Sequence, residues 1–198
     1  YLDIKSIMGY VYNHASGVIR ATGGNIDLST GQANLQIDGD TNGQKKEEYR
    51  KFTPIIIEGK VEATSALNNT TSETNQGNIN IRAYLGDIYV DGGTIEAKAG
   101  PNGEVESVAG NVTLDGAQNI TIGFETESAR ADDPTTQAGP NGENKDKYER
   151  DDEREYYKPK VDTSGKFVNG TAANISGTNI TLTSGSGANI ISMSAVNN

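Results

Sequence analysis

A short strand-like phrase repeats along the chain, usually in closely spaced pairs. In each copy a small or turn-forming residue and a polar residue, most often Asn, precede alternating apolar and polar residues. The pairs are 24–28 with 33–37, 77–81 with 86–90, 110–114 with 118–122, and 178–182 with 188–192. Repetition of a short strand bounded by turn residues is typical of a solenoid, in which each repeat stacks on the next. Any specific activity is then expected in the segments that interrupt the repeat.

The alternation within each copy indicates a strand with one face inside and one outside, as for Ile79 and Ile81 on either side of Asn80. A weaker third strand precedes each pair, so that three strands form one closed triangular turn. The sequence therefore predicts an all-β parallel β-helix of four to five coils in one domain over 1–198. The repeat cores are 19–37, 61–90, 95–122 and 175–192, and the segment 2–12 is expected to form an earlier coil.

Stacking of these coils predicts two kinds of column. Residues Ile26, Ile79, Val112 and Ile180 are expected to lie above one another inside the stack. The preceding residues 25, 78, 111 and 179, all Asn, are expected to form a ladder at the corner. A simpler explanation is that Asn occurs there because it tolerates turn conformations. Both explanations place these residues at a corner.

The repeat is interrupted by insertions at about 38–59, 98–109 and 123–171. The first and third are predicted to leave the same corner and to be related, because 42–50 aligns without gaps on 141–149. Pro followed by Asn-Gly in 100–104 and 139–143 predicts the tips of β-hairpins. The charged segment 145–160 fits either a solvated hairpin or helix, or a contact surface. The candidate contact residues are Tyr49, Phe52, Tyr148, Tyr156 and Tyr157.

Composition excludes several classes of function. The net charge of −10 opposes binding to nucleic acid, which requires a basic face. The absence of Cys excludes thiol catalysis, disulfides and cysteine-type zinc sites. No apolar run is long enough to cross a bilayer, so no membrane-spanning segment is predicted. No signal peptide is recognisable, and the chain starts inside a strand-like segment, as expected for a piece of a longer protein.

The sequence predicts no enzyme, no catalytic residues and no cofactor. Polysaccharide-cleaving β-helices need carboxylates fixed on one strand face, whereas the acidic pairs 132–133 and 151–152 lie in an insertion. The single His14 excludes a multi-histidine metal site. Asp38, Asp40 and Asn42 match the opening of a calcium loop, although its twelfth position is Tyr49 instead of Glu. An Asx-rich turn explains the same residues without calcium.

The phrases at 110–114 and 179–185 resemble the haemagglutinin-type repeats of filamentous haemagglutinin, a family of bacterial two-partner secretion exoproteins. The resemblance covers the strand repeats and leaves the insertions at 38–59 and 123–171 unmatched. It implies a right-handed parallel β-helix, export through an outer-membrane secretion partner, and a filament on a Gram-negative cell surface. The family's amino-terminal secretion domain and any carboxy-terminal toxin have no counterpart in these residues.

Three functions follow as hypotheses. The first is a structural and adhesive segment of a secreted filament, whose insertions contact a host protein or a glycan. The second is the shaft of a contact-dependent toxin-delivery exoprotein. The third is a β-helical carbohydrate-active enzyme, which predicts a groove of carboxylates and aromatic residues on a strand face. Tyr84 and Tyr89 are its only aromatic candidates, and Tyr84 is expected at a corner.

Overall fold

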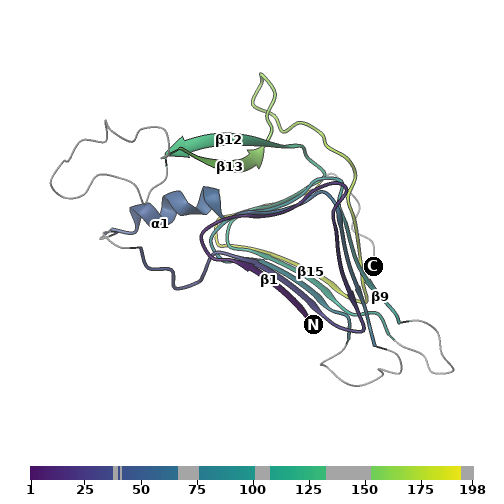
Figure 1. The fold of residues 1–198 in the computed structure, drawn as a ribbon. Coiled ribbons are helices and arrows are strands. Elements are labelled where there is room, and N and C mark those ends of the chain that lie inside the picture. Colours follow the sequence, from purple (N-terminus) through teal and green to yellow (C-terminus); the bar gives the residue numbers. More distant parts are fainter. Residues whose placement is uncertain (38–39, 41, 67–75, 101–107, 133–152, 193–198) are drawn as a thin grey trace.

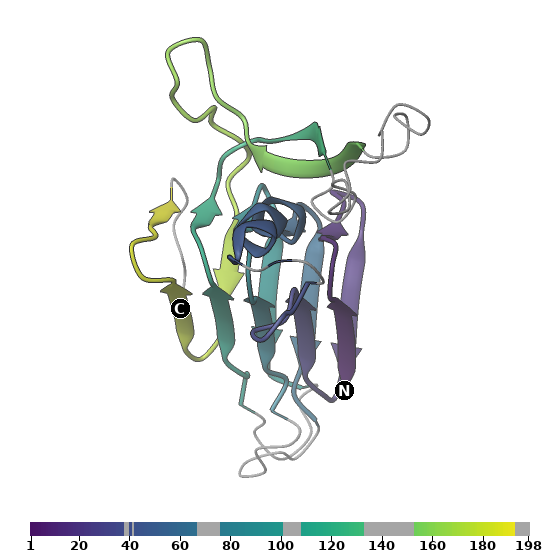
Figure 2. The same ribbon diagram turned by 90° about the vertical axis from the view of Figure 1, so that its left-hand side faces the viewer.

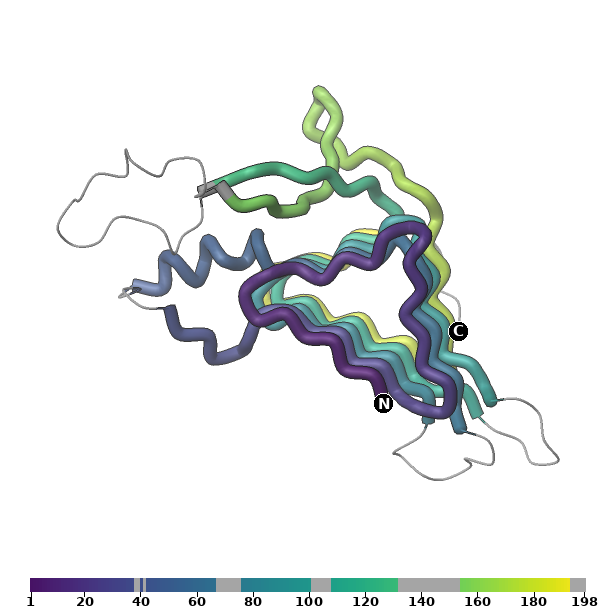
Figure 3. Tube along the Cα trace, in the orientation of Figure 1, coloured from purple at the N-terminus to yellow at the C-terminus, as the bar shows by residue number. Residues whose placement is uncertain are grey.

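The computed structural model describes residues 1–37, 40, 42–66, 76–100, 108–132 and 153–192. Within them strands dominate, accompanied by one short α-helix, α1 (Gln44–Tyr49), and the 3-10 helix η1 (Arg50–Phe52). The chain winds along a triangular path, and successive turns lie one behind another (Figure 3). The predicted mostly-β chain with stacked parallel strands is confirmed.

Each side of the triangle is a parallel sheet. The first sheet contains, in order, β1 (Leu2–Ser6), β4 (Ile26–Thr30), β7 (Ile79–Ala83), β10 (Val112–Gly116) and β15 (Ile180–Ser184). The second contains β2 (Val11–Asn13), β5 (Ile55–Ile57), β8 (Ile88–Val90), β11 (Ile120–Ile122) and β16 (Ile190–Ser192). The third contains β3 (Val18–Thr22), β6 (Lys60–Thr64), β9 (Thr94–Lys98) and β14 (Asn174–Ser176). Strands β1 and β2 form the earlier coil that the sequence predicts.

The interior of the triangle is a stack of aliphatic side chains. In the first sheet Ile26 pairs with Ile79, Ile79 with Val112, and Val112 with Ile180. The first three are fully buried, whereas Ile180 in the last turn is only partly buried. The predicted internal column is therefore confirmed. Burial of each such side chain contributes about 2 kcal/mol, which makes these columns the main stabilising feature of the stack.

The predicted Asn ladder is also confirmed, with a more specific bonding pattern. The side-chain oxygen of Asn25 accepts the backbone N–H of Asn78 at 2.9 Å, and that of Asn78 accepts the N–H of Asn111 at 2.8 Å. The amide of Asn179 donates to the Asn111 side chain at 2.9 Å. Asn25 and Asn78 therefore each satisfy a backbone donor in the next turn, whereas Asn111 bonds the side chain of Asn179.

A second ladder, which the sequence did not predict, stands at the corner before the second sheet. The Asp87 carboxylate accepts the N–H of Asn119 at 3.0 Å, and the Asn119 side chain accepts the N–H of Asn189 at 2.9 Å. These residues occupy the same place in the second phrase of each pair as the first Asn ladder does in the first phrase. This equivalence of position could have been used to predict the second ladder from the sequence.

The second sheet is buried on both faces. Ile55 and Ile57 point into the triangle, while Ile56 points the other way and is nevertheless fully buried. Tyr89 and Thr121 continue the outward row and are also buried. Four elements cover this face: α1 and η1, which lie between β4 and β5 in the sequence, and β12 (Thr126–Asp132) and β13 (Glu153–Pro159), which lie between β11 and β14. Sheets covered on both faces read as continuous apolar runs, which explains the Ile-Ile-Ile sequence of β5.

These covering elements form one unit, here called the lobe: α1, η1, β12 and β13. The strands β12 and β13 pair antiparallel, and β13 packs against η1. Figures 1 and 2 show α1 and the β12–β13 pair on the same side of the stack. Two insertions that are distant in sequence thus meet on one face of the protein.

The first predicted insertion, 38–59, needs correction. Residues 55–57 within it form β5, whereas 33–37, expected as a strand, has no strand structure. The observed insertion, 31–54, leaves the corner between the first and second sheets, and 123–173 leaves the corner between the second and third. The prediction of a shared corner is therefore wrong. The strand β5 was missed because apolar–polar alternation identifies strands with one exposed face, and β5 is buried on both faces.

Further insertions join the third sheet to the first. One lies between β6 and β7 and was not predicted; the other lies between β9 and β10, where 98–109 was predicted. The predicted hairpin tips at 100–104 and 139–143 fall outside the described residues, apart from Gly100. The same holds for 141–149, so its proposed kinship with 42–50 stays a prediction.

Candidate functional site

A hollow of about 420 Å³ lies on the outer face of the first sheet, across β1, β4 and β7. The parallel register brings its side chains together in two rows. Asp3, Asp27 and Asn80 are partners in one row. Lys5, Ser29 and Arg82 form the row two residues further along the same strands. Because alternate residues of a strand face one side, the apolar residues between them point into the core.

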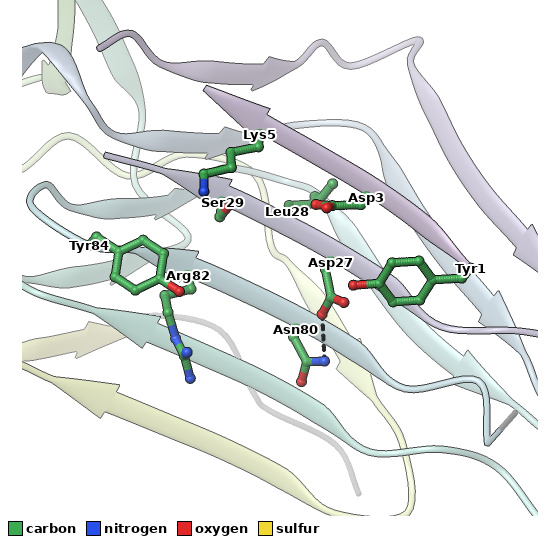
Figure 4. A pocket seen from close by; sticks show the side chains of 9 residues that line it. All are labelled: Tyr1, Asp3, Lys5, Asp27, Leu28, Ser29, Asn80, Arg82 and Tyr84. Atoms are coloured by element: carbon green, nitrogen blue, oxygen red, sulfur yellow. Dashed lines mark hydrogen bonds between the residues drawn. The ribbon is translucent and has the colours of Figure 1, made fainter. Parts of the chain in front are cut away.

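Two tyrosines mark opposite ends of the hollow (Figure 4). Tyr1 directly precedes β1, and its side chain is 80% exposed. Tyr84 directly follows β7 and lies beside the Arg82 guanidinium, whose carbon is 5.6 Å from the ring centroid. The polar side chains of Asp27 and Asn80 lie between the two rings. The site therefore combines aromatic surfaces with hydrogen-bonding groups of both kinds.

Hydrogen bonds hold several of these groups in place. The side-chain amide of Asn80 donates to Asp27 at 2.7 Å. A hydrogen bond to Asp27 raises the pKa of Tyr1 to about 12, because ionising the phenol would remove the donor and place two negative charges together. Arg82 is anchored from the far side by Asp115, with 2.9 Å between Nε and the carboxylate oxygen. Within the described part of the chain, Lys5 and Ser29 form no side-chain hydrogen bond or ion pair, so they can bind a ligand.

A second hollow, of about 640 Å³, lies where 123–173 leaves the stack, and it contains Glu58, Asp91 and Glu125. Each carboxylate already has a partner. Thr126 donates to Glu58 at 3.5 Å, the N–H of Thr171 donates to Asp91 at 3.3 Å, and Lys160 lies 2.7 Å from Glu125. Burial raises the pKa of Asp91. Among the described residues, no group of three or more His, Cys, Asp or Glu side chains is arranged to hold a metal ion.

The predicted calcium residues are not seen as a group. Asp38 lies outside the described residues, and Asn42 is exposed. Both carboxylate oxygens of Asp40 accept backbone N–H groups at the start of α1, from Lys45 at 3.1 Å and Lys46 at 3.0 Å. Asp40 therefore satisfies helix donors that would otherwise lack partners, which is the Asx-type explanation. The calcium site stays an untested prediction.

The predicted partner-contact residues need correction in part. Tyr49 and Phe52 are 1% and 0% exposed, so neither can form an external contact surface. Tyr156 lies edge-on against Phe52 at 5.9 Å, and Tyr157 lies against Tyr12 at 4.9 Å. These rings cover the apolar outer face of the second sheet, which would otherwise be wet. Tyr148 lies outside the described residues.

The residues weighed for catalysis are also placed. His14 stacks on Tyr12 with 3.9 Å between ring centroids. Tyr89 is buried beneath the lobe, while Tyr84 follows β7 at a corner and lines the hollow. The acidic pair 151–152 and Asp133 lie outside the described residues, and of Asp132 only the backbone, at the end of β12, is described. Sequence reasoning missed all the other residues that line this hollow, which are Tyr1, Asp3, Lys5, Asp27, Leu28, Ser29, Asn80 and Arg82. The sequence pattern shows that the polar strand residues among them face outward. It does not show that they come together in one site.

Comparisons with family models, curated proteins and solved structures find no match. The haemagglutinin-type resemblance of the repeats therefore stays a prediction. No helix among the described residues has the length and apolar character needed to cross a membrane.

A charged cluster on the third sheet provides a test of the structure. Glu62 is surrounded by Arg20, Lys60 and Lys98, at 2.7, 2.6 and 2.8 Å. Hydrogen bonds from Lys60 and Lys98 lower the pKa of Glu62 to about 2. A carboxylate with a depressed folded-state pKa stabilises the protein above its unfolded pKa, and this contribution is lost as the pH falls through the folded value.

We therefore expect Glu62→Gln to lower the free energy of unfolding by about 1–2 kcal/mol at pH 7, a value reduced because the cations are partly exposed. The difference from the parent should shrink as the pH falls from about 4.5 to 2. Urea unfolding at several pH values measures it. Glu96→Gln is the matched control, because Glu96 pairs only with Lys98 among the described residues, and it should cost less than half as much. A difference independent of pH would contradict the assignment.

Proposed function

We propose that this chain is a structural and adhesive segment of a secreted bacterial surface filament. In this proposal the stack is a right-handed parallel β-helix that gives stiffness, and the protein leaves the cell through an outer-membrane secretion partner. The role combines a stiff shaft with contact surfaces on its sides. The contacted molecule is a host-cell protein or a glycan.

The observation that supports the shaft is the constant register of the turns. Asp3, Asp27, Asn80, Thr113 and Thr181 follow one another across the five strands of the first sheet without a slip. The Asn ladder joins the same turns at their corner. Stacked units that contact their neighbours through continuous ladders form stiff, extended bodies whose sides are available for binding.

The observation that supports a contact role is the lobe. Aromatic packing against the second sheet fixes it to the stack, so its outer side presents charged groups in a defined arrangement. Arg130 and Glu155 face each other across β12 and β13 and are exposed. Glu47 and Glu48 are exposed on α1. A rigid support of this kind reduces the entropy lost on binding.

Binding of the purified chain to cultured epithelial cells tests this function. Saturable binding is expected, and it should weaken in a variant with Arg130→Glu and Glu155→Lys, which exchanges the two exposed charges without removing covered residues. A variant with Thr181→Ala and Thr183→Ala, on the distant end of the first sheet, is the control and should bind like the parent. Absence of saturable binding by the parent would overturn the adhesive part of the proposal.

A further inference from the structure

We propose that the hollow on the first sheet binds a neutral oligosaccharide, extended from Tyr1 to Tyr84. This inference deepens the proposed adhesive function by assigning a glycan site to the shaft instead of the lobe. The biological role of the site rests on the proposed adhesive function. The binding itself does not, because it can be measured without cells.

The hollow is long and shallow, with a tyrosine at each end. Tyr1 lies one residue before the first aligned position of the strands, and Tyr84 lies one residue after the last. They are two strands apart, which places their backbones roughly 20 Å from each other. A long, shallow site with an aromatic ring at each end fits a chain of sugar rings better than a compact metabolite. The apolar C–H face of a sugar ring can pack on each tyrosine.

The side chains between the two rings are polar and include both hydrogen-bond donors and acceptors. Asp27 and Asp3 offer carboxylate acceptors, and Asn80 offers an amide that both donates and accepts. Lys5 and Ser29 add donors that form no side-chain hydrogen bond or ion pair within the described residues. A sugar presents hydroxyl groups that donate and accept around its edge. Alternating acceptors and donors at fixed strand spacings match this pattern.

The charges around the hollow favour a neutral ligand. Two carboxylates and two cations line the hollow, and one of the cations, Arg82, is also balanced by Asp115 outside it. The chain as a whole carries a net charge of −10. A polyanion would be repelled at long range, and a polycation would meet Lys5 and Arg82. A neutral ligand encounters neither cost.

A peptide strand is a less suitable occupant. Peptides that bind sheets usually add to a free strand edge through backbone hydrogen bonds. The hollow lies on the flat side of β1, β4 and β7, where these strands are already paired with one another. Side chains alone are available there, as a sugar requires.

The side chains of the hollow are already organised without a ligand. The Asn80–Asp27 hydrogen bond and the Arg82–Asp115 ion pair hold side chains in place before any ligand arrives. Their support is the sheet itself, which is the most regular part of the molecule. Little ordering is therefore needed on binding, which favours measurable affinity at an open site.

Titration with neutral tetrasaccharides, made of glucose, mannose or N-acetylglucosamine units, tests the proposal. The readouts are isothermal calorimetry and the backbone amide shifts of the labelled protein. Binding with a dissociation constant of about 0.1–1 mM is expected for at least one sugar. The shifted amides should belong to β1, β4 and β7, and the bound sugar should be recovered intact.

Two single variants, Tyr84→Ala and Asn80→Ala, should each raise the dissociation constant at least fivefold. Thr181→Ala is the matched control, because Thr181 occupies the row of Asn80 on the same sheet, two strands away, and its variant should bind normally. The thermal midpoint of each variant shows that it is folded. No binding of any of the three sugars, shifts confined to the lobe, or cleavage of the sugar would overturn the proposal.

These outcomes are distinguishable from failure of the proposed function. If the parent chain binds cells but none of the three sugars, adhesion occurs through another surface and only the glycan site is wrong. If the sugars bind but the cells do not, the site exists and the adhesive role is wrong.

Discussion

Replacing Phe52 by alanine is expected to lower the free energy of unfolding by about 3–4 kcal/mol. The side chain is fully buried, and its ring lies 6.1 Å from Tyr49 and 5.9 Å from Tyr156. It is thus the point at which the two insertions meet. A cavity there should also release the lobe from the second sheet. Urea unfolding measures the first effect, and hydrogen exchange of the β5 and β8 amides measures the second.

Phe124→Ala is a matched control for this change. Phe124 packs edge-on against Phe167 at 5.5 Å, but its side chain is partly exposed and the pair lies outside the lobe. Its replacement should cost about half as much or less and should leave exchange at β5 unchanged. If Phe52→Ala costs under about 1 kcal/mol, the aromatic contacts do not hold the lobe in place.

Ile79→Ala should destabilise the stack to a similar extent, by about 3–4 kcal/mol. The side chain lies between Ile26 and Val112 in the internal column, and all three are fully buried. Because neighbouring turns hold the backbone on both sides, the space left by the isoleucine cannot close. Thermal or urea unfolding followed by circular dichroism measures the loss.

The same substitution at Ile180, in the same column, should cost no more than half as much. Ile180 belongs to the last turn and is only partly buried. Its replacement by alanine therefore removes less buried apolar surface than the replacement of Ile79 does. Equal costs at the two positions would show that burial along the column is uniform, contrary to the structure.

The stack of parallel strands could be predicted well from the sequence, because most strands of its first and third sheets have one buried face and one exposed face. That alternation located the Ile79 column and the Asn78 ladder to the residue. It failed at β5, since a strand covered on both faces has no alternation. The same alternation wrongly predicted a strand at 33–37. Alternation alone cannot show whether a neighbouring strand is available for pairing.

The lobe and the hollow could not be predicted from local pattern. Tyr49 and Phe52 resemble exposed contact residues until β13, about 100 positions later, covers them. Asp3, Asp27 and Asn80 come from three separate repeats and become one site only through the register. Each grouping depends on which strands become neighbours, and no single stretch of sequence contains that information.

Tyr157 follows the fourth strand of the second sheet, yet it packs on Tyr10 and Tyr12 of the first turn, with centroid distances of 5.0 and 4.9 Å. In a simple stack each turn contacts only its neighbours, and the end turns open first. Here the β12–β13 arm spans the intervening turns and ties the first of them to a much later part of the chain. Opening of the first turn must therefore disrupt that arm as well. Fraying of the first turn is therefore coupled to release of the β12–β13 arm.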